Sequence, residues 1–87
     1  MKFKFSITKI VFANPLLNEK IAYVETTATD LHQNKTTGNI RVRFNDHGIF
    51  PIPEDIASFT SQLSLRRLVA VELKRYIKPQ KRWLEPE

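Results

Sequence analysis

The sequence predicts an α+β domain: a three- or four-stranded antiparallel meander, followed by a short helix and a longer C-terminal amphipathic helix that packs on one face of the sheet. Three observations lead to this fold class. The first half of the chain alternates polar and apolar residues, turn-forming residues separate the alternating segments, and residues 64–78 have helical periodicity. A chain of 87 residues has apolar side chains for one core, so we expect one domain at 1–80 and a C-terminal tail at 81–87.

Residues 2–8 alternate strictly between polar and apolar side chains, which is the pattern of a half-buried strand. The alternation changes phase after Thr8, because Ile10 and Phe12 fall in the opposite register. We therefore expect either a β-bulge near Thr8 or burial of both faces towards the end of the strand.

A second strand is predicted at residues 21–32, which are rich in threonine and β-branched side chains. The preceding Asn14-Pro15 dipeptide predicts a turn, and we expect Leu16 and Leu17 in the connecting loop to pack against the core.

A third strand is predicted at residues 40–44, after a polar hairpin loop at 33–39. Its three apolar residues alternate with Arg41 and Arg43, so the two arginines would occupy the face opposite the core. If the strands share this register, an open sheet face carries Lys2, Lys4, Arg41 and Arg43.

Residues 45–48 have the composition of a tight turn, in which we expect Gly48 to supply a positive φ. A short fourth strand at 49–52 would be confined to the sheet edge by Pro51. Pro53, followed by two acidic residues, predicts a short helix at about 53–61.

The long helix has signals at both ends: Ser64 as N-cap, and Pro79, which cannot continue the helical hydrogen bonds. On a helical wheel an apolar face gathers Leu65, Leu68, Val69, Leu73, Tyr76 and Ile77. Behind it lies a basic stripe of Arg67, Lys74, Arg75 and Lys78.

Positive charge is concentrated in this part of the chain. The formal net charge is +5, and residues 64–82 alone carry +6 against +1 for residues 1–63. Such asymmetry indicates an anionic partner, either nucleic acid or an acidic protein surface, although a solvated helix back has the same composition. The candidate binding residues are Arg41, Arg43, Arg66, Arg67, Lys74, Arg75, Lys78, Lys81 and Arg82.

We interpret the chain as a small basic non-catalytic binding protein that engages the phosphate backbone of nucleic acid through its C-terminal helix. Because the helix would cover one sheet face, Arg41 and Arg43 on the other face should not share a contact surface with the helix stripe. The alternative is an inhibitor or adaptor of the kind that phages and mobile elements encode, docking on a larger nucleic-acid-processing protein.

A third hypothesis is a metal-free ribonuclease-type toxin that uses His32 and His47 as acid and base, with Asp46 and Arg43 nearby. Histidine is common in turns for no chemical reason, so this hypothesis ranks below the other two.

Several function classes have no support in the sequence. There is no cysteine for a disulfide or thiolate site, and two histidines do not make a metal centre. Gly38 and Gly48 do not form a phosphate-binding loop, so no nucleotide cofactor is expected. No apolar segment reaches the roughly 18 residues needed to span a bilayer, and the N-terminal apolar run is too short for a secretory signal. We expect no membrane association and a cytoplasmic location.

Overall fold

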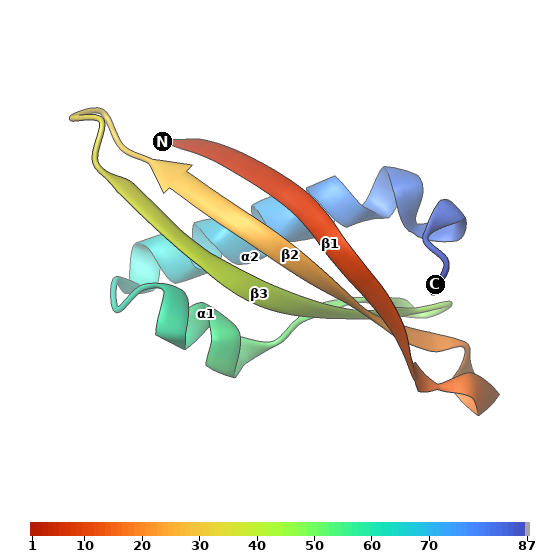
Figure 1. The fold of residues 1–87 in the computed structure, drawn as a ribbon. Coiled ribbons are helices and arrows are strands. Elements are labelled where there is room, and N and C mark those ends of the chain that lie inside the picture. Colours follow the sequence, from red (N-terminus) through yellow and green to blue (C-terminus); the bar gives the residue numbers. More distant parts are fainter. Residues whose placement is uncertain (87) are drawn as a thin grey trace.

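The computed structural model describes residues 1–86 and contains a twisted four-stranded antiparallel sheet with a long helix running across one face (Figure 1). The sheet order is β1-β2-β3-β4, with the strands at Lys2–Asn14, Glu19–Thr29, Lys35–Asn45 and Gly48–Pro51. The helices are α1 at Pro53–Phe59 and α2 at Leu63–Ile77, with 3-10 turns η1 at Pro15–Leu17 and η2 at Lys78–Trp83. The predicted α+β meander with two C-terminal helices is confirmed.

A β-bulge at Thr8 explains the phase change in β1. Ile7 and Lys9 stand opposite consecutive residues of β2, so Thr8 is the extra residue, and its hydroxyl donates to the Tyr23 carbonyl at 3.2 Å. The bulge returns Ile10 to the core face and leaves Lys9 on the opposite face.

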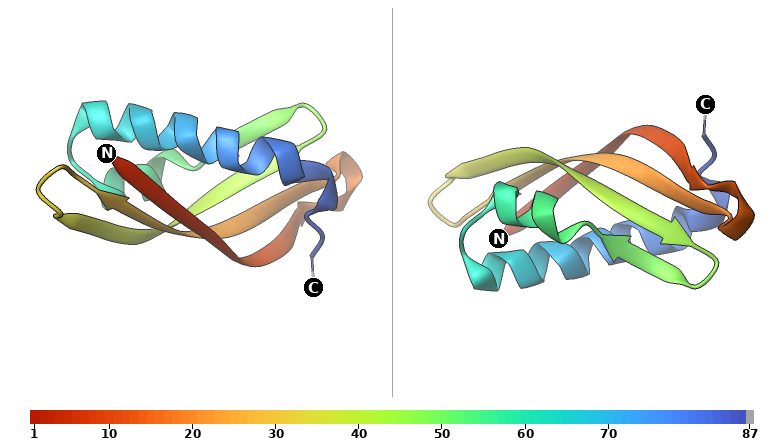
Figure 2. Two further views of the ribbon diagram at one scale, coloured as in Figure 1. Left: turned by 90° about the horizontal axis from the view of Figure 1, so that it is seen from above. Right: turned by 90° about the horizontal axis from the view of Figure 1, so that it is seen from below.

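The core lies between the sheet and α2, as the views from above and below show (Figure 2). Its largest fully buried side chains come from the central strands and from one side of α2: Val24, Thr26, Ile40, Val42, Val69, Leu73 and Ile77. Burial of these branched side chains contributes most of the stabilisation available to a domain of this size.

Two expectations about α2 are wrong. The helix begins at Leu63 with Gln62 as N-cap, and no side chain caps it. The first helical bond, from the Arg66 N–H to the Gln62 carbonyl, forms two residues earlier than a Ser64 cap would allow. Leu68 is 40% exposed, because the buried seam repeats every four residues from Leu65 to Ile77 and Leu68 lies beside that seam.

The β2–β3 hairpin is tighter than the sequence indicated. β2 ends at Thr29 and β3 already begins at Lys35, so most of the expected loop at 33–39 is strand. The Asp30 carboxylate holds the turn by accepting from the backbone N–H groups of His32 at 2.8 Å and Asn34 at 2.9 Å. Gln33 takes the left-handed conformation there, with φ 65°.

Other local differences concern the loops. Leu16 is 95% exposed and Leu17 56%, so neither packs on the core; Asn14 caps η1 and directs both outward.

Gly48 has no positive φ and is the first residue of β4. Its lack of a side chain matters for another reason, since a Cβ there would lie 2.8 Å from the ring of Phe50. The short helix ends at Phe59, two residues before the expected end.

The C-terminal segment continues past Pro79 as η2 and then returns to the sheet. Leu84 packs on the core, and the buried Lys20 ammonium donates to the Leu84 carbonyl at 3.2 Å and to Glu85 at 3.3 Å. Trp83 stays 73% exposed. The part of residues 81–87 that the structure describes is thus attached to the domain.

Candidate nucleic-acid interface

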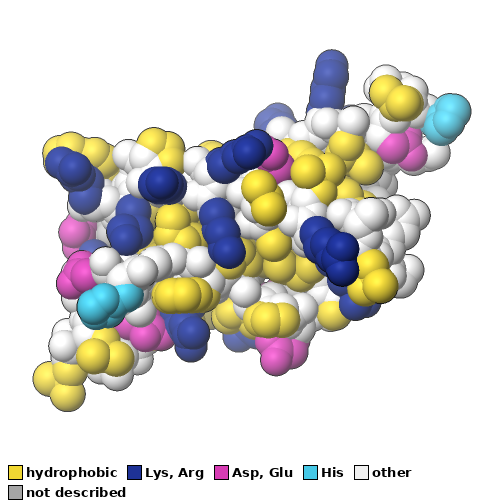
Figure 3. Space-filling model, turned by 180° about the vertical axis from the view of Figure 1, so that it is seen from behind, with side chains coloured by type: hydrophobic (Ala, Val, Ile, Leu, Met, Phe, Trp, Pro, Cys, Tyr) yellow, Lys and Arg dark blue, Asp and Glu magenta, His cyan; other side chains and the backbone are white. Residues whose placement is uncertain are grey.

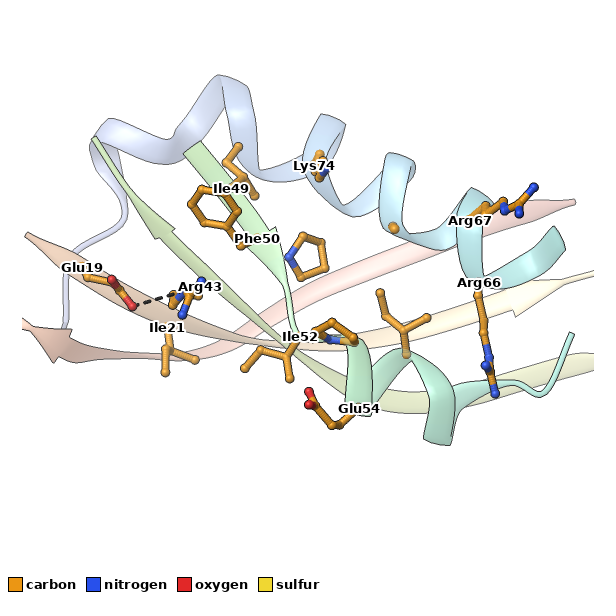
Figure 4. A pocket seen from close by; sticks show the side chains of 14 residues that line it. Glu19, Ile21, Arg43, Ile49, Phe50, Ile52, Glu54, Arg66, Arg67 and Lys74 are labelled. Atoms are coloured by element: carbon orange, nitrogen blue, oxygen red, sulfur yellow. Dashed lines mark ion pairs between the residues drawn. The ribbon is translucent and has the colours of Figure 1, made fainter. Parts of the chain in front are cut away.

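A groove of about 960 Å³ separates α2 from β4 and the start of α1 (Figure 4). Four cationic side chains line it: Arg43, Arg66, Arg67 and Lys74. Its apolar lining comes mainly from β4 and the start of α1, and includes Ile49, Phe50, Pro51, Ile52 and Ile56, with Ala70 on the helix side. Two carboxylates, Glu19 and Glu54, also reach the groove, so its cations are in excess.

Among the groove cations, Arg67 and Lys74 are the two whose charged groups are least engaged by other residues of the described chain. Both are exposed, and within residues 1–86 neither forms an ion pair with a carboxylate. They are seven residues apart on α2, which is two helical turns or about 10 Å along the axis. One strand of B-form DNA carries about three phosphates over that length.

Arg43 and Arg66 are partly engaged by the protein. Arg43 Nε lies 3.3 Å from Glu19 Oε1, and the guanidinium carbon is 5.4 Å from the Phe50 ring centroid. Arg66 Nε donates to the Thr60 carbonyl at 2.7 Å, which links the start of α2 to the end of α1. Both line the groove and retain further guanidinium N–H donors.

Arg43 shares this groove with Arg67 and Lys74 although it projects from the opposite sheet face. The expectation that sheet arginines and helix cations occupy separate surfaces therefore fails for Arg43. The reason is that β4 has only four residues, and the groove passes around this short edge strand.

Arg41 lies on the open sheet face as expected, but its guanidinium is held internally. Asp55 accepts from Arg41 Nε at 2.8 Å and from its Nη2 at 3.0 Å. This ion pair lowers the pKa of Asp55 and raises the pKa of Arg41. A phosphate at Arg41 would compete with a two-bond carboxylate contact.

The remaining predicted binding residues are dispersed. Arg75 donates to Glu72 at 3.1 Å on the side of α2 that faces β1, and Lys78 is exposed at the end of α2. Lys81 Nζ donates to the Asn45 carbonyl at 2.7 Å, and the guanidinium of Arg82 lies 5.9 Å from the Trp83 ring centroid. The basic stripe predicted for the helix is therefore divided between several surfaces. From behind, Lys and Arg side chains are spread over the α2 side with apolar side chains between them (Figure 3).

The open sheet face carries Lys2 and Lys4 beside Arg41 and Arg43, as the alternation predicted. It also carries two lysines that the sequence did not place there, Lys9 and Lys35. Lys9 reaches it only through the bulge at Thr8, and Lys35 only because β3 begins early. The phase change in β1 was the one signal that could have identified Lys9.

The two histidines lie at opposite ends of β3. His32 is in the β2–β3 turn and His47 in the β3–β4 turn, with about 35 Å of extended strand between them. They cannot act as acid and base on one phosphate. Within residues 1–86 no group of three or more His, Asp or Glu side chains is placed to hold a metal ion, and no helix has the length and apolarity to cross a membrane.

The chain matches no protein family, no curated protein and no solved structure with which we compared it.

The combination at the groove is specific: cations on two walls, an apolar lining between them, and one exposed aromatic ring beside a guanidinium. Such a surface can neutralise several phosphates of one chain while apolar faces of sugars or bases contact the lining.

Proposed function

We propose that this protein is a non-catalytic nucleic-acid-binding module that holds a phosphate backbone along the α2 side of the groove. The observation that carries the proposal is the pair Arg67 and Lys74, exposed on one helix wall and without a carboxylate partner in the described chain. Arg66 and Arg43 add positive charge at the same groove.

The arrangement suits an extended polyanion better than a single small anion. A compact anion site requires several donors converging on one point, whereas these cations are distributed along and across an open groove. Distributed lysines and arginines gain affinity by releasing counterions from successive phosphates. The half-exposed Phe50 ring offers an apolar contact that an isolated phosphate would not use.

The test is a fluorescence-anisotropy titration of labelled DNA and RNA oligonucleotides at several salt concentrations. The variant Arg67→Glu/Lys74→Glu should weaken binding at least tenfold, and the slope of log K against log salt should become shallower by about 1.8 if two phosphate contacts are lost. The matched control, Lys4→Glu/Lys35→Glu, makes the same change in net charge on the open sheet face and should retain the wild-type slope.

A different result would contradict the proposal. Wild-type protein that binds no oligonucleotide at 100 mM salt would contradict nucleic-acid binding itself. A larger loss with Lys4→Glu/Lys35→Glu would move the interface to the open sheet face, away from α2.

The inhibitor or adaptor function remains the second candidate, because apolar residues alternate with the cations on the outer side of α2. Leu63 is 65% exposed and Val71 44%, and helical periodicity places both on the same side of α2 as Arg67 and Lys74. A protein partner should lose affinity when Val71 is changed to Ser, whereas the salt slope of oligonucleotide binding should not change.

A further inference from the structure

The two edges of the sheet differ in how their backbone groups are satisfied. At the β3 edge, beyond the end of β4, Asp55 accepts from the Arg41 N–H at 2.9 Å and the Ile52 N–H donates to the Arg41 carbonyl at 2.9 Å. At the other edge, β1 pairs only with β2, and no backbone hydrogen bond joins its outer side to another described residue. In Figure 1 β1 forms this edge of the sheet, and no further strand lies beside it.

An apolar shelf lies beneath the first half of this edge, between β1 and α2. We use this term for Met1, Phe3, Phe5, Leu68 and Tyr76, which line a hollow of about 460 Å³ together with the ion pair that Arg75 and Glu72 form at 3.1 Å. The rings of Phe3 and Phe5 are stacked with centroids 5.8 Å apart, and the ring centroids of Phe5 and Tyr76 are 5.2 Å apart. Met1 and Leu68 remain 48% and 40% exposed, so the shelf is incompletely covered by the chain itself.

Lys2 and Lys4 flank the same edge on the opposite sheet face. They alternate with Phe3 and Phe5 along β1, and no carboxylate in residues 1–86 forms an ion pair with either. Any strand that pairs with this edge must place one row of its side chains over the apolar shelf and the other row beside the lysines, because side chains alternate across a strand.

We propose that the edge Lys2–Ile7 is a strand-addition site for an extended segment of a partner protein in which apolar and acidic residues alternate. Backbone hydrogen bonds to the open edge supply affinity, the shelf receives the apolar row, and Lys2 and Lys4 pair with the acidic row. The bulge at Thr8 interrupts the regular edge and sets the C-terminal limit of the site.

A second copy of this chain is a poorer occupant than an acidic strand. Antiparallel pairing of two β1 edges would bring lysines of both copies together on one face, and like charges on neighbouring strands are destabilising. Lysines and bulges at edges discourage such self-pairing in many sheets. They do not oppose a strand of opposite charge.

Two labelled nine-residue peptides test the proposal, one alternating Val with Glu and one alternating Val with Lys. In anisotropy titrations at moderate salt the Val/Glu peptide should bind wild type at least tenfold more tightly than the Val/Lys peptide. Lys2→Glu/Lys4→Glu should reverse this preference. The control Lys78→Glu/Arg82→Glu changes net charge equally at two exposed sites beyond the end of α2, away from Lys2 and Lys4, and should keep it. Circular dichroism verifies that all variants fold.

A third peptide separates strand pairing from simple charge attraction. N-methylation of alternate Val/Glu backbone nitrogens removes the donors that pairing needs without changing charge, so this peptide should lose most of the affinity. Equal binding of the Val/Glu and Val/Lys peptides, an unchanged preference in Lys2→Glu/Lys4→Glu, or full binding of the N-methylated peptide would each overturn the proposal. A dimer in light scattering that is lost in Lys2→Glu/Lys4→Glu or in Phe5→Glu would assign the edge to a second copy and overturn it as well. None of these outcomes depends on whether α2 binds nucleic acid.

Discussion

Asp55 holds both the main chain and the side chain of Arg41. Its Oδ2 accepts from the Arg41 backbone N–H at 2.9 Å and from Nε at 2.8 Å, while Oδ1 accepts from Nη2 at 3.0 Å. One carboxylate thereby closes the β3 edge, fixes the first turn of α1 against the sheet and neutralises an arginine on the open face. The contact defines where α1 lies and hence one wall of the α2 groove.

Acid should weaken this contact. Hydrogen bonds and charge from Arg41 lower the pKa of Asp55 below its ordinary value of 3.8, so folding favours the ionised carboxylate. The stabilisation is then fully present above about pH 4 and is lost as pH falls through the folded-state pKa. We expect Asp55→Asn to lower the free energy of unfolding at pH 7 by about 1 to 2 kcal/mol and to flatten its decline between pH 4 and pH 2, as measured by urea unfolding.

The control for that series is Glu54→Gln, which removes a neighbouring carboxylate that forms no ion pair within residues 1–86. If Glu54→Gln and Asp55→Asn had the same acid profile, the Asp55–Arg41 contact would not be a determinant of stability.

Leu73 and Leu68 should lose very different amounts of stability on the same substitution. Leu73 is fully buried beneath the sheet, so Leu73→Asp places an unpaired carboxylate in the core and should cost on the order of 3 to 5 kcal/mol, enough to unfold most of the protein at 37 °C. Leu68→Asp places the charge at the half-exposed edge of the apolar shelf and should cost about 1 kcal/mol. Thermal melts of the two variants compare them directly; similar losses would mean that α2 is rotated from the orientation described.

Lys20 should control attachment of the C-terminal segment more than global stability. Its side chain is 8% exposed and its ammonium contacts the Leu84 carbonyl and the Glu85 carboxylate. Lys20→Met fills the same space with an apolar side chain, and such replacements of buried ionic contacts are often near neutral. We expect a change of only a few degrees in melting temperature, together with faster tryptic cleavage after Lys81 and Arg82, followed by mass spectrometry. Lys4→Met, at an exposed lysine, should leave that cleavage rate unchanged.

Replacing both histidines by alanine should leave nucleic-acid affinity within about twofold of wild type, because neither lies at the α2 groove. Wild-type protein incubated with labelled RNA in EDTA should release no specific fragments. Metal-independent cleavage that disappears in the His32→Ala/His47→Ala variant would show instead that the protein is a ribonuclease.

The sequence by itself determined the strand and helix order, because that order depends on local alternation, turn residues and helical periodicity. The alternation of residues 2–8, the edge position required by Pro51 and the helix signals at Pro53 and Pro79 each act over a few residues. Even the bulge at Thr8 was visible as one of two alternatives, since inserting a residue changes the phase of the pattern.

The tertiary structure alone decided which charged residues remain available to contact a binding partner. Arg41 and Arg43 have the same pattern in the sequence, yet Asp55 engages one from 14 positions away and Glu19 the other from a neighbouring strand. Lys9 changes face because of a single inserted residue, Lys20 is buried by a segment 64 positions later, and Arg43 reaches the α2 groove only because β4 is short. Periodicity specifies which way a side chain points along its own element. Which partner it meets is fixed by where the other elements pack, and that depends on contacts between residues far apart in the chain.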